Sequence, residues 1–140
     1  MTTGSCYCGK ITIEFTGEPE RKAICHCSNC RHYTGSMFSN NYVIPSDRFK
    51  VFGDPKEISK IADSGKRIVN CFCSDCGTTM YRWGDAFGGK EGMRIIQPGI
   101  LDDKSVIDGF RPDLEMFTED RVKWIDAIDG LAQHEKMPQS

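Results

Sequence analysis

One cysteine-rich stretch occurs in two near copies, Cys25-His26-Cys27-Ser28-Asn29-Cys30 and Cys71-Phe72-Cys73-Ser74-Asp75-Cys76, and a shorter relative, Cys6-Tyr7-Cys8, lies near the start of the chain. A Cys-x-x-Cys turn directs two thiolates into one volume, and a second such pair completes the tetrahedral shell that zinc prefers. Three clusters in one chain are therefore a strong indication of metal binding.

The abundance of cysteine has two explanations, a disulfide framework or metal sites, and the compartment decides between them. Eight cysteines occur among 140 residues. The first ten residues lack the apolar core of a signal peptide, and no run approaches the ~20 apolar residues of a membrane-spanning helix. We therefore expect a cytoplasmic protein, in which paired cysteines are more often metal ligands than disulfides.

Length and charge restrict the classes of protein that remain. The 140 residues include 18 basic and 20 acidic side chains and are 39% hydrophobic, which is typical of a soluble globular chain. A net charge of −2 gives no broad attraction to nucleic acid or to a membrane surface. We expect one domain over residues 1–133 and a polar, disordered tail over residues 134–140, and a homodimer stays open.

The hydrophobic pattern predicts short strands. Residues 10–15 alternate polar and apolar side chains, and residues 41–44, 49–52 and 93–98 have similar strand character. A turn at 63–65 divides residues 59–70 into two further segments. Helix signals are weak and are limited to residues 31–34 and 118–128. The large aromatic side chains Trp83, Phe87 and Trp124 are expected to line the core or a pocket wall.

The residue that follows each cluster suggests which cysteines share a metal. Cys8 precedes Gly9 and Cys76 precedes Gly77. A glycine there permits a positive φ, so that the backbone curls beneath the metal and offers amides to the thiolates. We therefore predict a closed structural zinc site, made by Cys6, Cys8, Cys73 and Cys76.

The central cluster differs, because Arg31 and not a glycine follows its last cysteine. Cys25, Cys27 and Cys30 provide three ligands, and catalytic zinc characteristically keeps a fourth position for water or substrate. Three thiolates make a modest Lewis acid but a good holder of a further soft sulfur ligand, which favours thiol chemistry.

The alternative hypothesis is a second structural site, closed by Cys71, His26 or His32. Cys71 is the ambiguous residue, since it could be that fourth ligand, a spare buried thiol or a replacement for Cys73 in the first site. Neither histidine is included among the candidate catalytic residues.

These motifs resemble those of the glutathione-dependent formaldehyde-activating enzyme family, also called the centromere protein V family. The matching stretches are residues 4–10, 25–31, 34–36, 72–78 and 99–103, together with Trp124. The resemblance implies a mainly β, zinc-stabilised β-tent of the mammalian-suppressor-of-Sec type, with short antiparallel sheets and little helix. It also implies a structural zinc on Cys6, Cys8, Cys73 and Cys76 and a catalytic zinc on Cys25, Cys27 and Cys30. Cys71 departs from the family pattern.

The activity implied by the resemblance is the addition of glutathione to formaldehyde, which gives S-hydroxymethylglutathione and is classed among the carbon-sulfur lyases. The candidate substrate-binding residues are Ser28, Asn29, Arg31 and Thr34, and the Arg31 guanidinium can meet a glutathione carboxylate through two hydrogen bonds. Two other hypotheses are a zinc-stapled protein-binding module without catalysis and a family member that acts on a specialised metabolite.

Overall fold

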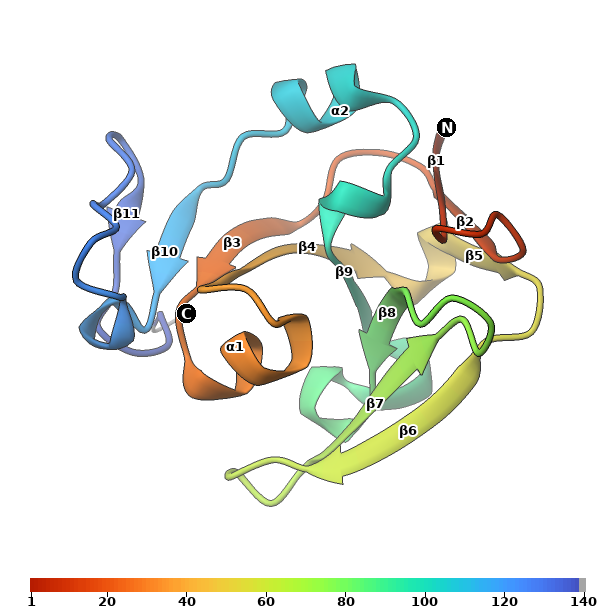
Figure 1. Ribbon diagram of the computed structural model, residues 1–140, viewed down its shortest axis with the longest axis horizontal. Helices are drawn as coiled ribbons and strands as arrows, with labels where there is room; N and C mark the ends of the chain where they lie inside the picture. The colour runs from red at the N-terminus through yellow and green to blue at the C-terminus, as the bar shows by residue number, and fades with distance from the viewer. Residues whose placement is uncertain (139–140) are drawn as a thin grey trace. The chain divides into compact units, whose positions relative to one another are not determined.

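The computed structural model describes residues 1–138, which are mainly β with little helix, as predicted (Figure 1). Within that range the chain forms eleven strands and two α-helices. The longer helix, α1 (Ser28–Thr34), has seven residues. No helix of the described range is long and apolar enough to cross a membrane.

The chain forms two compact units, which we describe separately. Unit 1 contains residues 1–20 and 42–110, and unit 2 contains residues 21–41 together with the chain from residue 111 onward. The single domain over residues 1–133 stays a prediction. Of the predicted disordered tail, residues 134–138 are described, and residues 139–140 lie outside the described range.

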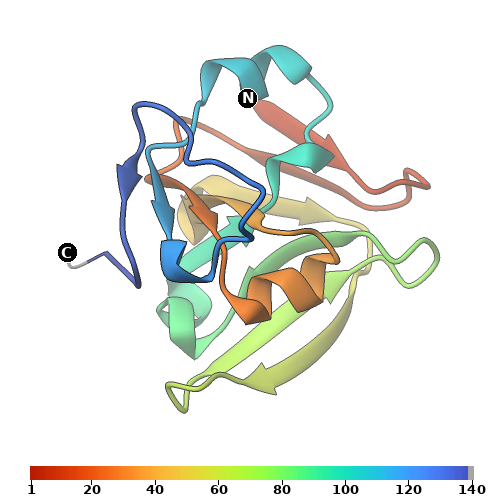
Figure 2. The ribbon, with the colours of Figure 1, turned by 60° about the vertical axis from the view of Figure 1, so that its left-hand side comes forward.

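Unit 1 contains an antiparallel sheet of three strands in the order β1 (Thr2–Ser5), β2 (Thr12–Phe15) and β5 (Phe49–Phe52), which lie side by side in both ribbon views (Figures 1 and 2). The alternation over residues 10–15 predicted β2 because one face of the strand is buried. Ile13 and Phe15 on that face are 0% and 1% exposed.

A second antiparallel ladder of unit 1 carries the rest of its core. β4 (Ser39–Pro45) starts in unit 2, and from Tyr42 onward it pairs with β9 (Met93–Ile96). The ladder continues through β8 (Thr79–Trp83) and β7 (Arg67–Phe72) to β6 (Lys56–Ile61). The β6–β7 hairpin confirms the predicted turn at residues 63–65. Buried apolar side chains and two cysteines from both sheets form one core cluster: Cys6, Ile11, Ile13, Phe15, Tyr42, Ile44, Cys73, Met80, Ile96 and Leu101.

Short turns connect the strands of unit 1. The 3-10 turns are η1 (Ser46–Arg48), η2 (Asp85–Phe87), η3 (Gly89–Glu91) and η4 (Pro98–Ile100). Helix α2 (Lys104–Gly109) follows, and the carboxylate of Asp103 caps it by accepting the Ser105 N–H at 2.9 Å. Trp83 and Phe87 are partly buried.

Unit 2 is built on parallel pairing. β10 (Leu114–Met116) lies between β3 (Arg21–Cys25) and β11 (Ala132–Gln133), parallel to both. Helix α1 begins directly after Cys27, contains Cys30 and includes the predicted turn at residues 31–34.

Two expectations for the carboxy-terminal part of unit 2 were wrong. The helix over residues 118–128 is reduced to the 3-10 turn η5 (Thr118–Asp120), because the backbone leaves helical angles at Arg121, where ψ is 134°; at the far end the Ile128 N–H donates to the Glu115 side chain. Trp124 is 74% exposed and therefore lines neither the core nor a pocket.

Candidate metal centres

The structure brings the cysteines into two groups. We call Cys6, Cys8, Cys73 and Cys76 the four-cysteine cluster, and Cys25, Cys27 and Cys30 the three-cysteine cluster. Within each group all Sγ atoms lie within 4.8 Å of one another. All eight cysteines are free thiols. The four-cysteine cluster belongs to unit 1 and the three-cysteine cluster to unit 2.

The geometry of the four-cysteine cluster fits a tetrahedral ion. The Sγ atoms of Cys6 and Cys8 are 3.6 Å apart, and those of Cys8 and Cys73 are 3.7 Å apart. Zn–S bonds of ~2.3 Å in a tetrahedron place neighbouring sulfurs about 3.8 Å apart, whereas a disulfide requires about 2.05 Å. The donor set and its spacing therefore suit zinc.

Two backbone turns present these thiols. Gly9 has a φ of 84° and its N–H bonds to Cys6 O at 3.0 Å, and Gly77 has a φ of 80° and its N–H bonds to Cys73 O at 2.8 Å. Both glycines therefore adopt the left-handed conformation that the sequence predicted for closed turns. An ion pair of 2.6 Å between Lys10 and Asp75 joins the two turns.

Hydrogen bonds to sulfur prepare this cluster for thiolates. The Ile11 N–H donates to Cys6 Sγ at 3.3 Å. The hydroxyl and the backbone N–H of Thr78 lower the pKa of Cys76 to about 5. A thiol with such a pKa is deprotonated at neutral pH, which is the form that binds metal.

The three-cysteine cluster lies where β3 ends and α1 begins. Cys25 is the last residue of β3, and Cys27 is the N-cap of α1, with its Sγ accepting the Cys30 N–H at 3.3 Å. Hydrogen bonds from Cys25 and Cys30 and the backbone N–H groups at the helix start lower the pKa of Cys27. The same contacts with Cys27 and Cys30 raise the pKa of Cys25. In this arrangement two thiols stabilise one thiolate. A thiophilic cation held by the three sulfurs can take over that role.

No fourth His, Cys, Asp or Glu among the described residues joins this group. His26 is hydrogen-bonded to Glu115, and His32 Nδ1 lies 2.8 Å from Ser28 O within its own helix. The soft donor set fits zinc with three protein ligands.

Cys71 belongs to neither cluster. It is fully buried on β7 of unit 1, and its thiol lies 3.7 Å from Glu57 Oε2. Burial raises its pKa to about 11, so that it stays a neutral thiol at pH 7. This environment is that of a spare buried cysteine.

The predicted substrate-binding residues all lie on α1, but they differ in what their side chains are free to do. Ser28 occupies its first turn, and Asn29 points its backbone N–H at Cys27. The Thr34 hydroxyl donates to Cys30 O at 2.7 Å and accepts the Ser36 N–H, so its proton is already used within the helix. Arg31 is partly exposed in the last turn.

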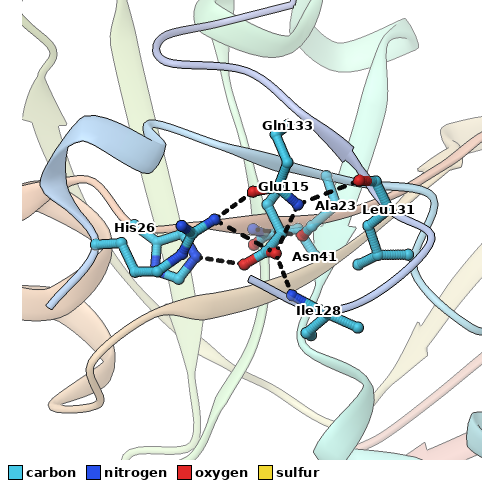
Figure 3. A network of polar contacts seen from close by, with 8 residues as sticks. Ala23, His26, Asn41, Glu115, Ile128, Leu131 and Gln133 are labelled. Carbon is cyan, nitrogen blue, oxygen red and sulfur yellow. Dashed lines mark hydrogen bonds and ion pairs between the residues drawn. The ribbon is translucent and has the colours of Figure 1, made fainter. Parts of the chain in front are cut away.

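Polar residues near the three-cysteine cluster were missed by the sequence analysis. The fully buried Ser39 is hydrogen-bonded to Cys30, and its hydroxyl also receives the Asn41 side-chain amide at 2.8 Å. Glu115, 1% exposed, receives His26 Nε2 at 2.7 Å (Figure 3). For Glu115 the one available signal was a polar residue between apolar neighbours, Leu114 and Met116, which is too common to select a site.

Relatives match this chain at low sequence identity. A protein of Schizosaccharomyces pombe named only as an uncharacterized lyase is 28% identical over 85% of this chain and 92% of its own length. Two proteins provisionally named as glutathione-dependent formaldehyde-activating enzymes, from Colletotrichum graminicola and Emericella nidulans, are 33% and 26% identical over 54% and 84% of this chain. The match covers 40% of the Colletotrichum protein and 68% of the Emericella protein.

Two further comparisons each cover most of the chain. The crystal structure of a Rhodobacter sphaeroides protein superposes with a TM-score of 0.57 at 16% identity, covering 79% of this chain and 96% of that one, and so shares its fold. The family model described as glutathione-dependent formaldehyde-activating enzyme matches residues 1–120. The chain therefore belongs to the glutathione-dependent formaldehyde-activating enzyme family.

Proposed function

We propose that this protein is a zinc-dependent carbon-sulfur lyase that adds glutathione to formaldehyde or handles a related glutathione adduct. The observation that carries the proposal is the three-cysteine cluster: three soft ligands at a helix start, with no fourth ligand residue among the described residues. The four-cysteine cluster supplies the contrasting structural site. The proposal thus includes two zinc ions per chain.

The roles of the residues follow from this geometry. Cys25, Cys27 and Cys30 hold the ion, and zinc there would supply a position at which an incoming thiol loses its proton at neutral pH. Addition then forms one S–C bond, while the carbonyl π pair moves to oxygen. The proton released by the glutathione thiol ends on that oxygen, so that atoms and charge balance.

Donors on α1 surround the reacting atoms in this proposal. Ser28 and Asn29 lie in the first turn, and we assign them the role of donors to the oxygen on which charge develops. The partly exposed Arg31 binds a glutathione carboxylate through its planar guanidinium. Thr34 offers only acceptor capacity, because its hydroxyl proton is held by Cys30 O.

Glutathione and formaldehyde also react spontaneously, so the test compares the rate with protein to the rate without it. Exchange NMR on the zinc-loaded chain measures the rate of S-hydroxymethylglutathione formation against protein-free buffer and against Cys27→Ala. We expect acceleration by the zinc-loaded chain alone. Equal rates in all three samples would exclude the formaldehyde reaction.

A binding experiment separates glutathione recognition from turnover. We expect glutathione to protect Cys25, Cys27 and Cys30 from alkylation, as read by peptide mass spectrometry. S-methylglutathione is the matched control, because it keeps both carboxylates but has no thiol to offer. If saturating glutathione did not protect these cysteines, the result would contradict a glutathione site.

A further inference from the structure

We propose that Glu115 is a positioning residue for the three-cysteine cluster, because its buried carboxylate fixes His26, the residue between Cys25 and Cys27, to the carboxy-terminal segment of the chain. The inference rests on the proposed function only in treating this cluster as the working site. It concerns contacts within unit 2 alone.

Glu115 is only 1% exposed, and both oxygens of its carboxylate accept hydrogen bonds from other residues. Its Oε1 accepts a hydrogen bond from His26 Nε2 at 2.7 Å. Its Oε2 receives the Ile128 backbone N–H at 2.9 Å and the Gln133 side-chain amide at 2.8 Å, and the Arg121 guanidinium lies 3.4 Å away. Figure 3 shows these donors converging on Glu115 from separate segments.

These contacts keep the buried group charged. Burial by itself would raise the pKa of Glu115, but the hydrogen bonds from Gln133, His26 and Ile128, together with the Arg121 charge, lower it below its ordinary value. A buried carboxylate is retained at low cost only when its lone pairs are satisfied in this way. The contact with His26 is therefore a charge-assisted hydrogen bond, stronger than one between neutral groups.

This bond orients the His26 ring, while the backbone N–H of His26 donates separately to Met116 O at 3.1 Å. An ionised carboxylate can only accept, so His26 Nε2 carries the proton. The other ring nitrogen, Nδ1, has no partner among the described residues, and the ring otherwise packs against Phe38 with ring centroids 5.6 Å apart. Because His26 is bonded to both Cys25 and Cys27 in the chain, a change in its backbone angles moves two of the three thiols.

The partners on Oε2 come from a part of the chain that the family match does not cover. The match ends at residue 120, whereas Arg121, Ile128 and Gln133 all lie beyond it. In this chain the carboxy-terminal segment thus holds Glu115 and, through it, the His26 ring between two of the clustered cysteines. Supporting groups of this kind change metal affinity by roughly 10–100-fold when they are lost.

The test uses the zinc-loaded full chain and a chromogenic chelator. Glu115→Gln keeps the shape of the side chain and removes its charge, and Glu119→Gln is the matched control, the same acid-to-amide change four residues later at an exposed position. We expect Glu115→Gln to weaken retention of one zinc by roughly 10–100-fold. That zinc should be the one missing from Cys27→Ala. Glu119→Gln should leave both unchanged.

A cadmium-113 NMR spectrum supplies a readout that a purely structural role would not move. We expect Glu115→Gln to shift the signal of the three-cysteine cluster and to leave that of the four-cysteine cluster in place. Lower unfolding stability with unchanged zinc retention and unchanged cadmium signals would overturn the proposal.

A milder variant covers the case in which Glu115→Gln fails to fold. Gln133→Ala removes one donor at Oε2 and leaves the His26 bond, so we expect the same change in zinc retention, reduced to a few-fold. Unchanged zinc retention in that variant would equally overturn the inference. Neither measurement contains glutathione, so a failure of the proposed function would leave these outcomes intact.

Discussion

The two cysteine clusters begin from similar sequences and reach different ends. In the four-cysteine cluster a glycine with positive φ follows each pair, and the chain turns back so that two pairs face one another. In the three-cysteine cluster Arg31 follows the last cysteine and the chain continues as helix α1. Beyond Cys30 the helix carries the chain onward, and no second pair joins this group among the described residues. The residue after the last cysteine thus marks the difference between a chain that turns back and one that continues as a helix.

The largest expected effect comes from opening the closed site. Cys73→Ala should abolish cooperative folding or lower the unfolding free energy by on the order of 5 kcal/mol, because structural zinc contributes directly to folding. Cys71→Ala, which removes an equally buried thiol outside both clusters, should cost about 1–2 kcal/mol. Chemical denaturation with zinc analysis measures both. Similar losses in the two variants would contradict a structural metal at Cys73.

Opening the other site should leave the fold intact. Cys27→Ala should reduce turnover to the uncatalysed rate and remove one zinc while cooperative unfolding is retained. Because Cys27 also caps α1, the alanine variant should additionally lose about 1 kcal/mol. Cys27→Ser is the control, since a serine keeps the cap but is a poor zinc ligand. Rate assays and thermal unfolding separate the two contributions, and a variant that unfolds entirely would erase the distinction between the clusters.

The glycine turns can be tested by themselves. Gly77→Ala should destabilise the zinc-loaded chain by about 1–2 kcal/mol, since its φ of 80° strains a residue with a side chain although its added Cβ meets open space. Gly99→Ala also enters open space, without a positive φ, and should change stability by no more than about 0.5 kcal/mol. Urea unfolding compares them. Equal effects would show that conformation at Gly77 is unimportant.

The smallest effect concerns the two helix caps. Where α1 is capped by a thiol, α2 is capped by Asp103, and the Ser105 hydroxyl and N–H lower the pKa of that carboxylate. A lowered pKa gives stability that is present above the unfolded value of 3.8 and is lost as the pH falls through the folded value. The wild type should therefore be slightly more stable than Asp103→Asn at pH 7, and the difference should be smaller at pH 2. Thermal unfolding at both pH values measures it, and a difference that grows on acidification has the wrong sign.

Local patterns predicted the parts of the fold in which one face of an element is buried. The alternation that ends in Ile13 and Phe15 predicted β2, and the turn at residues 63–65 predicted the β6–β7 hairpin even though every residue of β6 is exposed. β10 and β11 have only three and two residues. Strands that short have no measurable period, and their parallel partners lie far away in the sequence.

Some residues of the two sites could be predicted from local sequence and others could not. Spacing predicted both groups of cysteines, because a turn of a few residues fixes where each thiol lies. Glu115 could not be predicted, because its importance depends on His26 and Gln133, from which it is remote in sequence. The helix predicted over residues 118–128 ends at Asp120, because the backbone becomes extended at Arg121, and the Ile128 N–H then donates to the Glu115 side chain.

Unit 2 is made of two separate stretches of the chain, so the order of synthesis on the ribosome affects when they can pair. Cys25, Cys27 and Cys30 emerge first, yet β10, the strand that pairs with the end of β3 beside them, is not complete until Met116. The four-cysteine cluster needs nothing beyond Cys76 for its ligands. During synthesis the four-cysteine cluster thus has all its thiols before the strand that pairs beside the three-cysteine cluster has been made.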